Sequence, residues 1–153
     1  MGGYIIKITM FIGEYSHTID AKNRLAFPAR LRNELGSRAV LTRGLDKCLF
    51  VYPIATWEKI AKNMSAFPIG DPETRSFVRL FLAGAADVEV DGQGRILLPE
   101  YLRRYAELEK NVTVTGLYDR VEIWNEEKWM AYRDLAQENT DGIAKKLGEL
   151  GLY

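Results

Sequence analysis

Two arginines occupy the same place in a short motif, Asp-x-x-x-Arg, that the chain contains twice. The first copy runs from Asp20 to Arg24 and the second from Asp91 to Arg95. A guanidinium group carries a permanent charge and a planar fork of N–H donors, so it suits anions and the paired acceptors of guanine. The aspartate can instead fold back onto the amides of its own turn and pair with the arginine, which would make each motif a self-contained turn. The residues alone leave both interpretations open.

Other basic residues surround the two motifs. Those suited to phosphate oxygens are Lys22, Arg30, Arg32, Arg103 and Arg104. Residues 20–43 hold six Lys and Arg against two acidic residues, residues 107–153 hold six against ten, and the formal net charge of the chain is zero. Such asymmetry is typical of a polar molecule with one face for anions, although solvated surfaces without a binding role give the same counts.

Groups that could support catalysis are sparse. The chain has one histidine, His17, and one cysteine, Cys48, and it contains neither a G-x-S-x-G nor an H-E-x-x-H motif. A nucleophile needs a neighbouring base and a metal needs several ligands, so we expect no enzyme, no metal or cofactor site and no small-molecule substrate. We expect His17 on the core side or rim of a strand, and Cys48 buried and unreactive within an apolar run.

The two motifs belong to a longer internal repeat. At a constant offset, residues of one copy match those of the other; the pairs include Gly13 with Gly84, Pro28 with Pro99, Leu31 with Leu102, and Arg32 with Arg103. After one inserted residue the match resumes, and it continues from Val40 and Val112 to Trp57 and Trp129. The repeat indicates two copies of one folding unit of about 45 residues.

Each copy is expected to form a strand, a hairpin turn, a second strand, a short helix and two further strands. The alternating pattern of residues 14–19, repeated in 86–91, predicts a half-buried strand. The residues expected to separate the elements are Asn23 and Gly94 in the turns, Pro28 and Pro99 at the helix starts, and Gly44 and Gly116 between the last two strands.

One copy alone would expose sheet edges and an apolar face, so we expect the two copies to pair as a closed barrel about an approximate twofold axis. The fold class is β-dominated α+β. The predicted parts are an N-terminal extension (1–10), a first repeat (11–56), a helical connector (57–83), a second repeat (84–128) and a helical tail (129–153). The narrow apolar stripe of Ile143, Leu147 and Leu150 in the tail can cover the chain's own core or that of a neighbour.

Membrane association is not expected. The sequence has no run of eighteen or more apolar residues, and residues 1–9 lack a basic start and a cleavage site. We therefore expect a cytoplasmic protein with no membrane partner, and we assign residues 1–9 no function.

Several segments together resemble the MraZ family of bacterial regulators of the division and cell-wall gene cluster. They are residues 13–24, 42–53, 84–86 and 91–99, and the match extends from about residue 10 into the tail. The resemblance implies two SpoVT-AbrB-type halves in a double-split β-barrel and ring-like homo-oligomers. It also implies sequence-specific binding of double-stranded DNA, regulation of transcription, and a place in the cytoplasm on the nucleoid.

In that family the paired D-x-x-x-R motifs are associated with DNA contact, and both are intact here, although Asn23 stands where a glycine is commoner. The resulting DNA-binding set is Asp20, Lys22, Arg24, Arg30, Arg32, Asp91, Arg95, Arg103 and Arg104. An alternative of another class is a ring-forming scaffold or protein-interaction module without DNA binding, which the zero net charge favours.

Overall fold

The computed structural model describes residues 10–152, so nearly all of the expected N-terminal extension lies outside the described residues. The first half contains β1 (Phe11–Thr18), β2 (Arg24–Ala26), α1 (Ala29–Leu35), β3 (Arg38–Arg43), β4 (Leu49–Pro53) and α2 (Ile54–Ser65). The second contains α3 (Pro72–Ala83), β5 (Ala86–Glu89), β6 (Arg95–Leu97), α4 (Glu100–Tyr105), β7 (Asn111–Tyr118), β8 (Val121–Asn125), α5 (Glu126–Glu138) and α6 (Thr140–Glu149).

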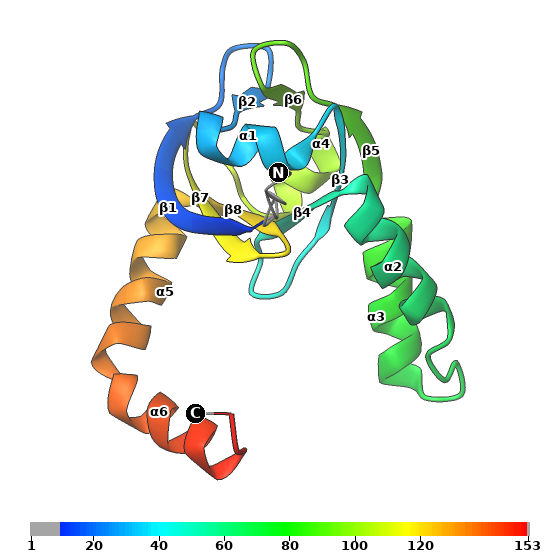
Figure 1. Ribbon diagram of the computed structural model, residues 1–153, viewed down its shortest axis with the longest axis vertical. Coiled ribbons are helices and arrows are strands. Elements are labelled where there is room, and N and C mark those ends of the chain that lie inside the picture. The colour runs from blue at the N-terminus through cyan, green and yellow to red at the C-terminus, as the bar shows by residue number, and fades with distance from the viewer. Residues whose placement is uncertain (1–9, 153) are drawn as a thin grey trace, which may run out of the picture.

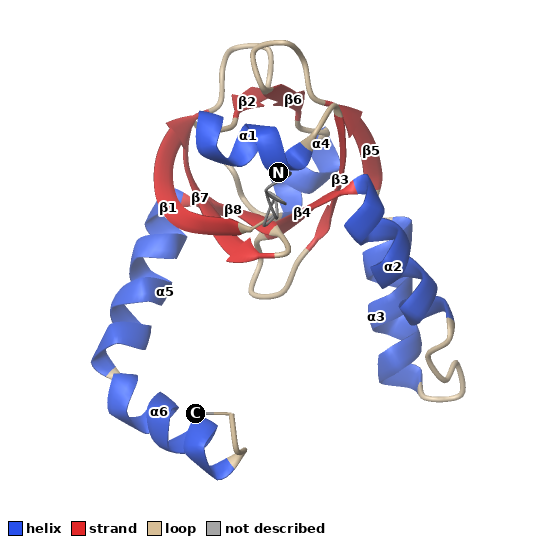
Figure 2. Ribbon diagram, in the orientation of Figure 1, coloured by secondary structure: helices blue, strands red, loops and turns tan. Residues whose placement is uncertain are grey.

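A curved antiparallel sheet of six strands forms the body of this mixed α+β protein (Figure 2). Its strand order is β1-β7-β8-β4-β3-β5. Replacing each strand by its counterpart in the other copy gives the same order read backwards, so a pseudo-twofold axis passes between β4 and β8. Because β1 pairs with β7 and β5 pairs with β3, each half completes the sheet of the other.

The expectation of a closed barrel is wrong, because the six-stranded sheet does not close on itself. Among the described residues, β1 pairs in this sheet with β7 alone and β5 with β3 alone. The short strands β2 and β6 pair with each other instead, as a separate ribbon that lies across the open side (Figure 1). The expected hairpin within the first half is reduced to one isolated bridge between Ile19 and Leu25. Strands of three residues offer too few hydrogen bonds to continue the sheet.

The main core lies between the ribbon and the concave face of the sheet. Helices α1 and α4 fill this space (Figure 1). Leu31 and Leu35 face inward from α1 and Leu102 from α4, and all three are buried. They pack with inward-facing residues of the ribbon and sheet, which include Phe11, Leu25, Phe27, Leu41, Val51, Ile96, Leu98, Val114 and Ile123. This shared burial fixes the ribbon to both halves.

Two helical arms leave the sheet on the side away from the ribbon (Figure 1). In the first arm, Phe81 of α3 stacks on Trp57 of α2 with ring centroids 5.3 Å apart. In the second, Trp129 of α5 meets Trp124 of β8 edge-on at 5.3 Å. The aromatic cluster at the base of the arms also buries Cys48, as predicted.

One predicted turn is misplaced. Gly116 lies inside β7, opposite Gly13 of β1, and β7 continues to Tyr118. A Cβ atom at Gly116 would collide with the backbone of Phe11 and Ile12. Glycine at this position therefore allows two strands to approach closely, whereas its counterpart Gly44 follows β3 and lies in the predicted connection to β4.

Candidate functional site

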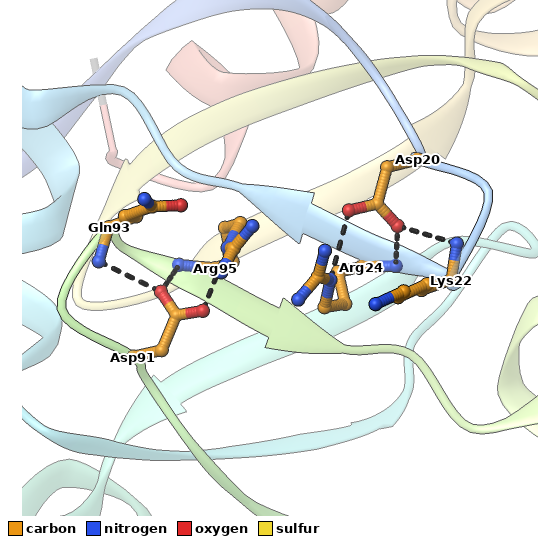
Figure 3. Close-up of polar contacts among 6 residues, drawn as sticks. All are labelled: Asp20, Lys22, Arg24, Asp91, Gln93 and Arg95. Carbon is orange, nitrogen blue, oxygen red and sulfur yellow. Dashed lines mark hydrogen bonds and ion pairs between the residues drawn. The ribbon is translucent and has the colours of Figure 1, made fainter.

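The first Asp-x-x-x-Arg motif forms a closed turn at one end of the ribbon. Oδ1 of Asp20 accepts hydrogen bonds from the backbone N–H groups of Lys22 and Arg24, both at 2.9 Å (Figure 3). Oδ2 of Asp20 accepts a further hydrogen bond from Nε of Arg24 at 3.0 Å. These bonds, above all the one from the Arg24 backbone, lower the pKa of Asp20. The aspartate is thus a charged anchor of its own turn.

The second motif repeats this arrangement atom for atom. Oδ1 of Asp91 accepts hydrogen bonds from the backbone N–H groups of Gln93 and Arg95 at 2.9 Å, and Oδ2 accepts one from Nε of Arg95 at 2.8 Å. The same contacts, led by the Arg95 backbone N–H, lower the pKa of Asp91. The interpretation in which aspartate stabilises the turn is therefore correct for both motifs.

Each turn is also held by the opposite half of the chain. Asn23 and Gly94 lie in the turns, as predicted, and have φ angles of 61° and 73°, which is left-handed backbone. The carbonyl of Gly94 accepts a hydrogen bond from the N–H of Phe27, and the carbonyl of Asn23 accepts one from the N–H of Leu98, both at 2.9 Å. Asparagine in the first turn therefore preserves the geometry that glycine gives the second.

The strand alternation of the ribbon determines where the arginines point. Leu25 and Ile96 are direct partners at its centre and both are buried, so their neighbours in each strand face outward. Arg24 and Arg95 consequently lie on the same outer face, next to each other and between the two aspartates (Figure 3). Their side chains remain 30% and 29% exposed.

Only one nitrogen of each guanidinium is used in these ion pairs. Asp20 and Asp91 contact Nε, and among the described residues no hydrogen bond is formed by the terminal nitrogens of Arg24 or Arg95. The two interpretations of the motif are therefore compatible, because the aspartate orients the side chain through Nε while the four N–H donors on the two terminal nitrogens of each arginine are not used by the turn. Such an orientation removes part of the side-chain entropy that a flexible arginine would lose on binding.

The remaining predicted cations divide into two groups. Lys22 on the first turn, Arg30 on α1 and Arg104 on α4 are exposed, and Arg104 donates to Oε1 of Glu100 at 2.7 Å. An exposed cation of this kind can contact a phosphate without disturbing the fold.

Arg32 and Arg103, by contrast, are half-buried behind the turns. A Cβ atom at Gly94 would collide with the guanidinium of Arg32, so the arginine of α1 packs directly against the turn of the second half. In the reciprocal position, Arg103 lines a hollow together with Asn23, and its Nε donates to the carbonyl of Leu98 at 3.0 Å. Arg32 therefore supports the turn that belongs to the other half, whereas Arg103 is bonded to its own half beside the first turn.

Leu97 is a residue of this face that the sequence analysis did not select. It is 58% exposed and is the direct partner of Arg24 in the ribbon. Together with Arg24, Arg95 and Pro99 it lines a groove of about 500 Å³ whose other wall carries Glu89 and its neighbours in β5. The signal was the alternation in Arg95-Ile96-Leu97, which places the leucine in phase with the arginine.

Other titratable groups lie away from this face. Burial lowers the pKa of His17 in β1 and raises the pKa of the Cys48 thiol. Within residues 10–152, no group of three or more His, Cys, Asp or Glu is arranged to hold a metal ion. In the same part of the chain, no helix has the length and apolar character needed to cross a membrane.

Comparison with known proteins gives matches over both halves. The family model for the MraZ protein, which its description calls antitoxin-like, matches residues 10–80 and 81–147. Transcriptional regulator MraZ of Halothermothrix orenii is 48% identical over 143 residues, which cover 94% of this chain and 100% of the relative. The protein of the same name from Carboxydothermus hydrogenoformans is 51% identical over 138 residues, with coverages of 90% and 96%. That from Clostridium tetani is 43% identical over 143 residues, with coverages of 94% and 100%.

Proposed function

This chain belongs to the MraZ family, and we propose that it is a transcriptional regulator that binds double-stranded DNA through the outer face of the β2–β6 ribbon. The names of its relatives support the regulatory role. The proposed targets are repeated DNA boxes in the division and cell-wall gene cluster, which implies a cytoplasmic protein associated with the nucleoid.

The observation that carries this proposal is that Arg24 and Arg95 lie on the same outward face of the ribbon. Both lie on one outward face, both are oriented through Nε, and both keep their terminal nitrogens clear of hydrogen bonds to the described residues. The major groove admits a two-stranded ribbon, and a guanidinium can donate to O6 and N7 of guanine there. Two oriented arginines on one narrow ribbon therefore suit base recognition better than a diffuse basic surface would.

The other members of the proposed DNA-binding set have supporting roles. Lys22, Arg30 and Arg104 are exposed, and we assign them to phosphate contacts, for which Arg104 would exchange its ion pair with Glu100. Arg32 packs against the second turn and Arg103 donates to the carbonyl of Leu98, so we assign them chiefly to holding the ribbon, with phosphate contact as a secondary role. Asp20 and Asp91 orient the arginines and make no contact of their own with the phosphates of DNA.

We further propose that the protein acts as a ring-like homo-oligomer. The α5–α6 arm projects from the sheet and exposes Leu135, Ile143 and Leu150 at 68%, 42% and 59%. Within residues 10–152 these side chains stay exposed, and a second copy of the chain would bury them. In the same proposal the two pseudo-twofold halves are SpoVT-AbrB-type units, with residues 57–83 as connector and 129–153 as the assembly tail.

A binding titration at several salt concentrations tests the central proposal. Duplexes selected from a random pool by the purified protein should bind with an affinity that falls linearly, on logarithmic axes, as salt rises. A scaffold or protein-interaction module, favoured by the zero net charge, would select no sequence and show no such dependence. Absence of sequence selection and of salt dependence would overturn the proposed DNA binding. The proposed oligomer is tested separately, by measuring the molecular mass of the protein in solution.

A further inference from the structure

The outer face of the ribbon is not symmetric, although the two arginines on it are equivalent. Arg24 and Arg95 correspond in the repeat, but Ala26 corresponds to Leu97. Ala26 is a half-buried methyl group, whereas Leu97 is a 58% exposed isobutyl group. The pseudo-twofold relation is therefore broken at the positions that flank the arginines.

The register of the ribbon assigns each of these residues to one arginine. Leu97 is the direct partner of Arg24, and Ala26 is the direct partner of Arg95. The Cβ atoms of directly opposed residues in an antiparallel pair lie about 5 Å apart. A base pair beside the one that Arg24 contacts therefore meets a leucine, while the corresponding neighbour of Arg95 meets only an alanine.

The strands beside the ribbon differ in the same sense. Glu89, which is 84% exposed, and Asp87 stand in β5 where the first copy has Thr18 and Ser16 in β1. Asp87 and Glu89 form ion pairs with Arg38 of β3, so this flank presents paired charges, whereas the hydroxyl groups of the other flank can donate hydrogen bonds to phosphates. A DNA duplex lying on the ribbon thus meets two chemically different flanks, which distinguishes its two orientations.

Leu97 lies in a groove that mixes apolar and charged side chains, and this mixture suits DNA better than a protein partner. The groove around Leu97 is lined by apolar residues, among them Val88 and Pro99, and also by the guanidinium groups of Arg24 and Arg95 and three carboxylates. A protein partner that covered the groove would have to remove these charged groups from water. In the major groove the 5-methyl group of thymine is the apolar feature that side chains recognise. Contact between this methyl group and Leu97 would remove both from water without disturbing the adjacent arginine.

We propose that Leu97 determines specificity by packing on the 5-methyl group of a thymine beside the base that Arg24 contacts, so that the two halves of the ribbon read different bases and the DNA box has a direction. This inference rests on the proposed DNA-binding function. It adds an apolar determinant that the basic residues do not supply.

Replacing each thymine of the selected box by uracil, one at a time, tests the contact, because uracil lacks only the 5-methyl group. Binding of the wild-type protein should weaken about fourfold at one position, the value expected for one buried methyl-sized group. In Leu97→Ala the same replacement should have no effect. Leu45→Ala removes a leucine of similar exposure, 56%, from the β3–β4 connection and should retain the wild-type uracil profile.

A second variant tests the direction of the box. Ala26→Leu places the larger side chain opposite Arg95 and should create a second uracil-sensitive thymine, which makes the preferred box more symmetric. The inference is overturned if Leu97→Ala keeps the wild-type uracil profile, or if the selected box has no thymine beside the base lost in Arg24→Ala. Absence of salt-dependent binding by the wild-type protein would overturn the proposed function itself, and the two failures are therefore distinguishable.

Discussion

Leu25 and Ile96 face each other at the centre of the ribbon, one from each half of the chain, and they are 0% and 1% exposed. Their burial sets which face of each strand points outward. We expect Leu25→Ala or Ile96→Ala to lower the free energy of unfolding by about 2–5 kcal/mol, because each leaves a cavity under the ribbon. Leu97→Ala, in the neighbouring outward position, should change it by less than about 0.5 kcal/mol. Chemical denaturation of the three variants measures the difference, and equal losses would contradict the inward–outward assignment.

A side chain at Gly94, in the second turn, should destabilise the protein. Gly94→Ala adds a Cβ at a φ of 73° and forces Arg32 aside, so we expect a loss of more than about 1 kcal/mol in the free energy of unfolding. Gly92→Ala is the matched control, because open space surrounds Gly92 and the first copy has Ala21 at this position. Adding Arg32→Ala to the Gly94 variant should recover part of the loss. Additive effects of the two substitutions would show that Arg32 does not contact the turn.

The sequence predicted the local elements well because the signals for them are local. The turns at Asn23 and Gly94 and the helix starts at Pro28 and Pro99 all depend on neighbouring residues. The internal repeat likewise predicts two related halves, because equivalent residues pack in equivalent surroundings.

The failures concern pairing between distant strands. The pairing of β2 with β6, in place of a hairpin with β1, depends on Phe27 bonding to Gly94 across the two halves, and no local pattern encodes this. Gly116 was assigned to a turn because a glycine that admits a neighbouring strand looks the same in sequence as one that bends the chain. The sequence also assigns Arg32 and Arg103 to phosphate contact together with the exposed cations, because residue type does not show which arginines are half-buried.

Removing either ribbon arginine should weaken DNA binding and relax its sequence preference. We expect Arg24→Ala and Arg95→Ala each to cost about 1–3 kcal/mol of binding free energy on a selected box. Arg24→Lys should keep most of the salt dependence and lose the base preference, because lysine lacks the guanidinium fork. Arg79→Ala, which removes an exposed arginine from the α3 arm, is the control. Fluorescence anisotropy with matched and scrambled duplexes measures both quantities, and wild-type affinity in both alanine variants would leave the arginines a purely structural role.

Acid should destabilise the ribbon through its two aspartates. The pKa values of Asp20 and Asp91 are lower in the folded protein than the ordinary value of 3.8, so their contribution is present above that pH and is lost as pH falls through the folded values. Unfolding free energies measured from about pH 5 downwards should therefore decrease more steeply for the wild type than for the variant Asp20→Asn with Asp91→Asn. Parallel profiles would mean that the two carboxylates titrate alike in the folded and unfolded chains.

The spacing of DNA boxes should matter if several ribbons bind one duplex. A single ribbon presents few phosphate and base contacts, so its affinity for one box should be low, whereas an oligomer can engage successive boxes at a high effective concentration. Boxes about ten base pairs apart face the same side of the duplex and can meet ribbons on one edge of a ring. Inserting half a helical turn, about five base pairs, rotates the second box away and should reduce affinity sharply, while a full-turn insertion should restore part of it. Gel-shift titrations on these three duplexes, with single-box affinity as the reference, measure the effect; equal affinity at every spacing would mean that each bound duplex engages one ribbon.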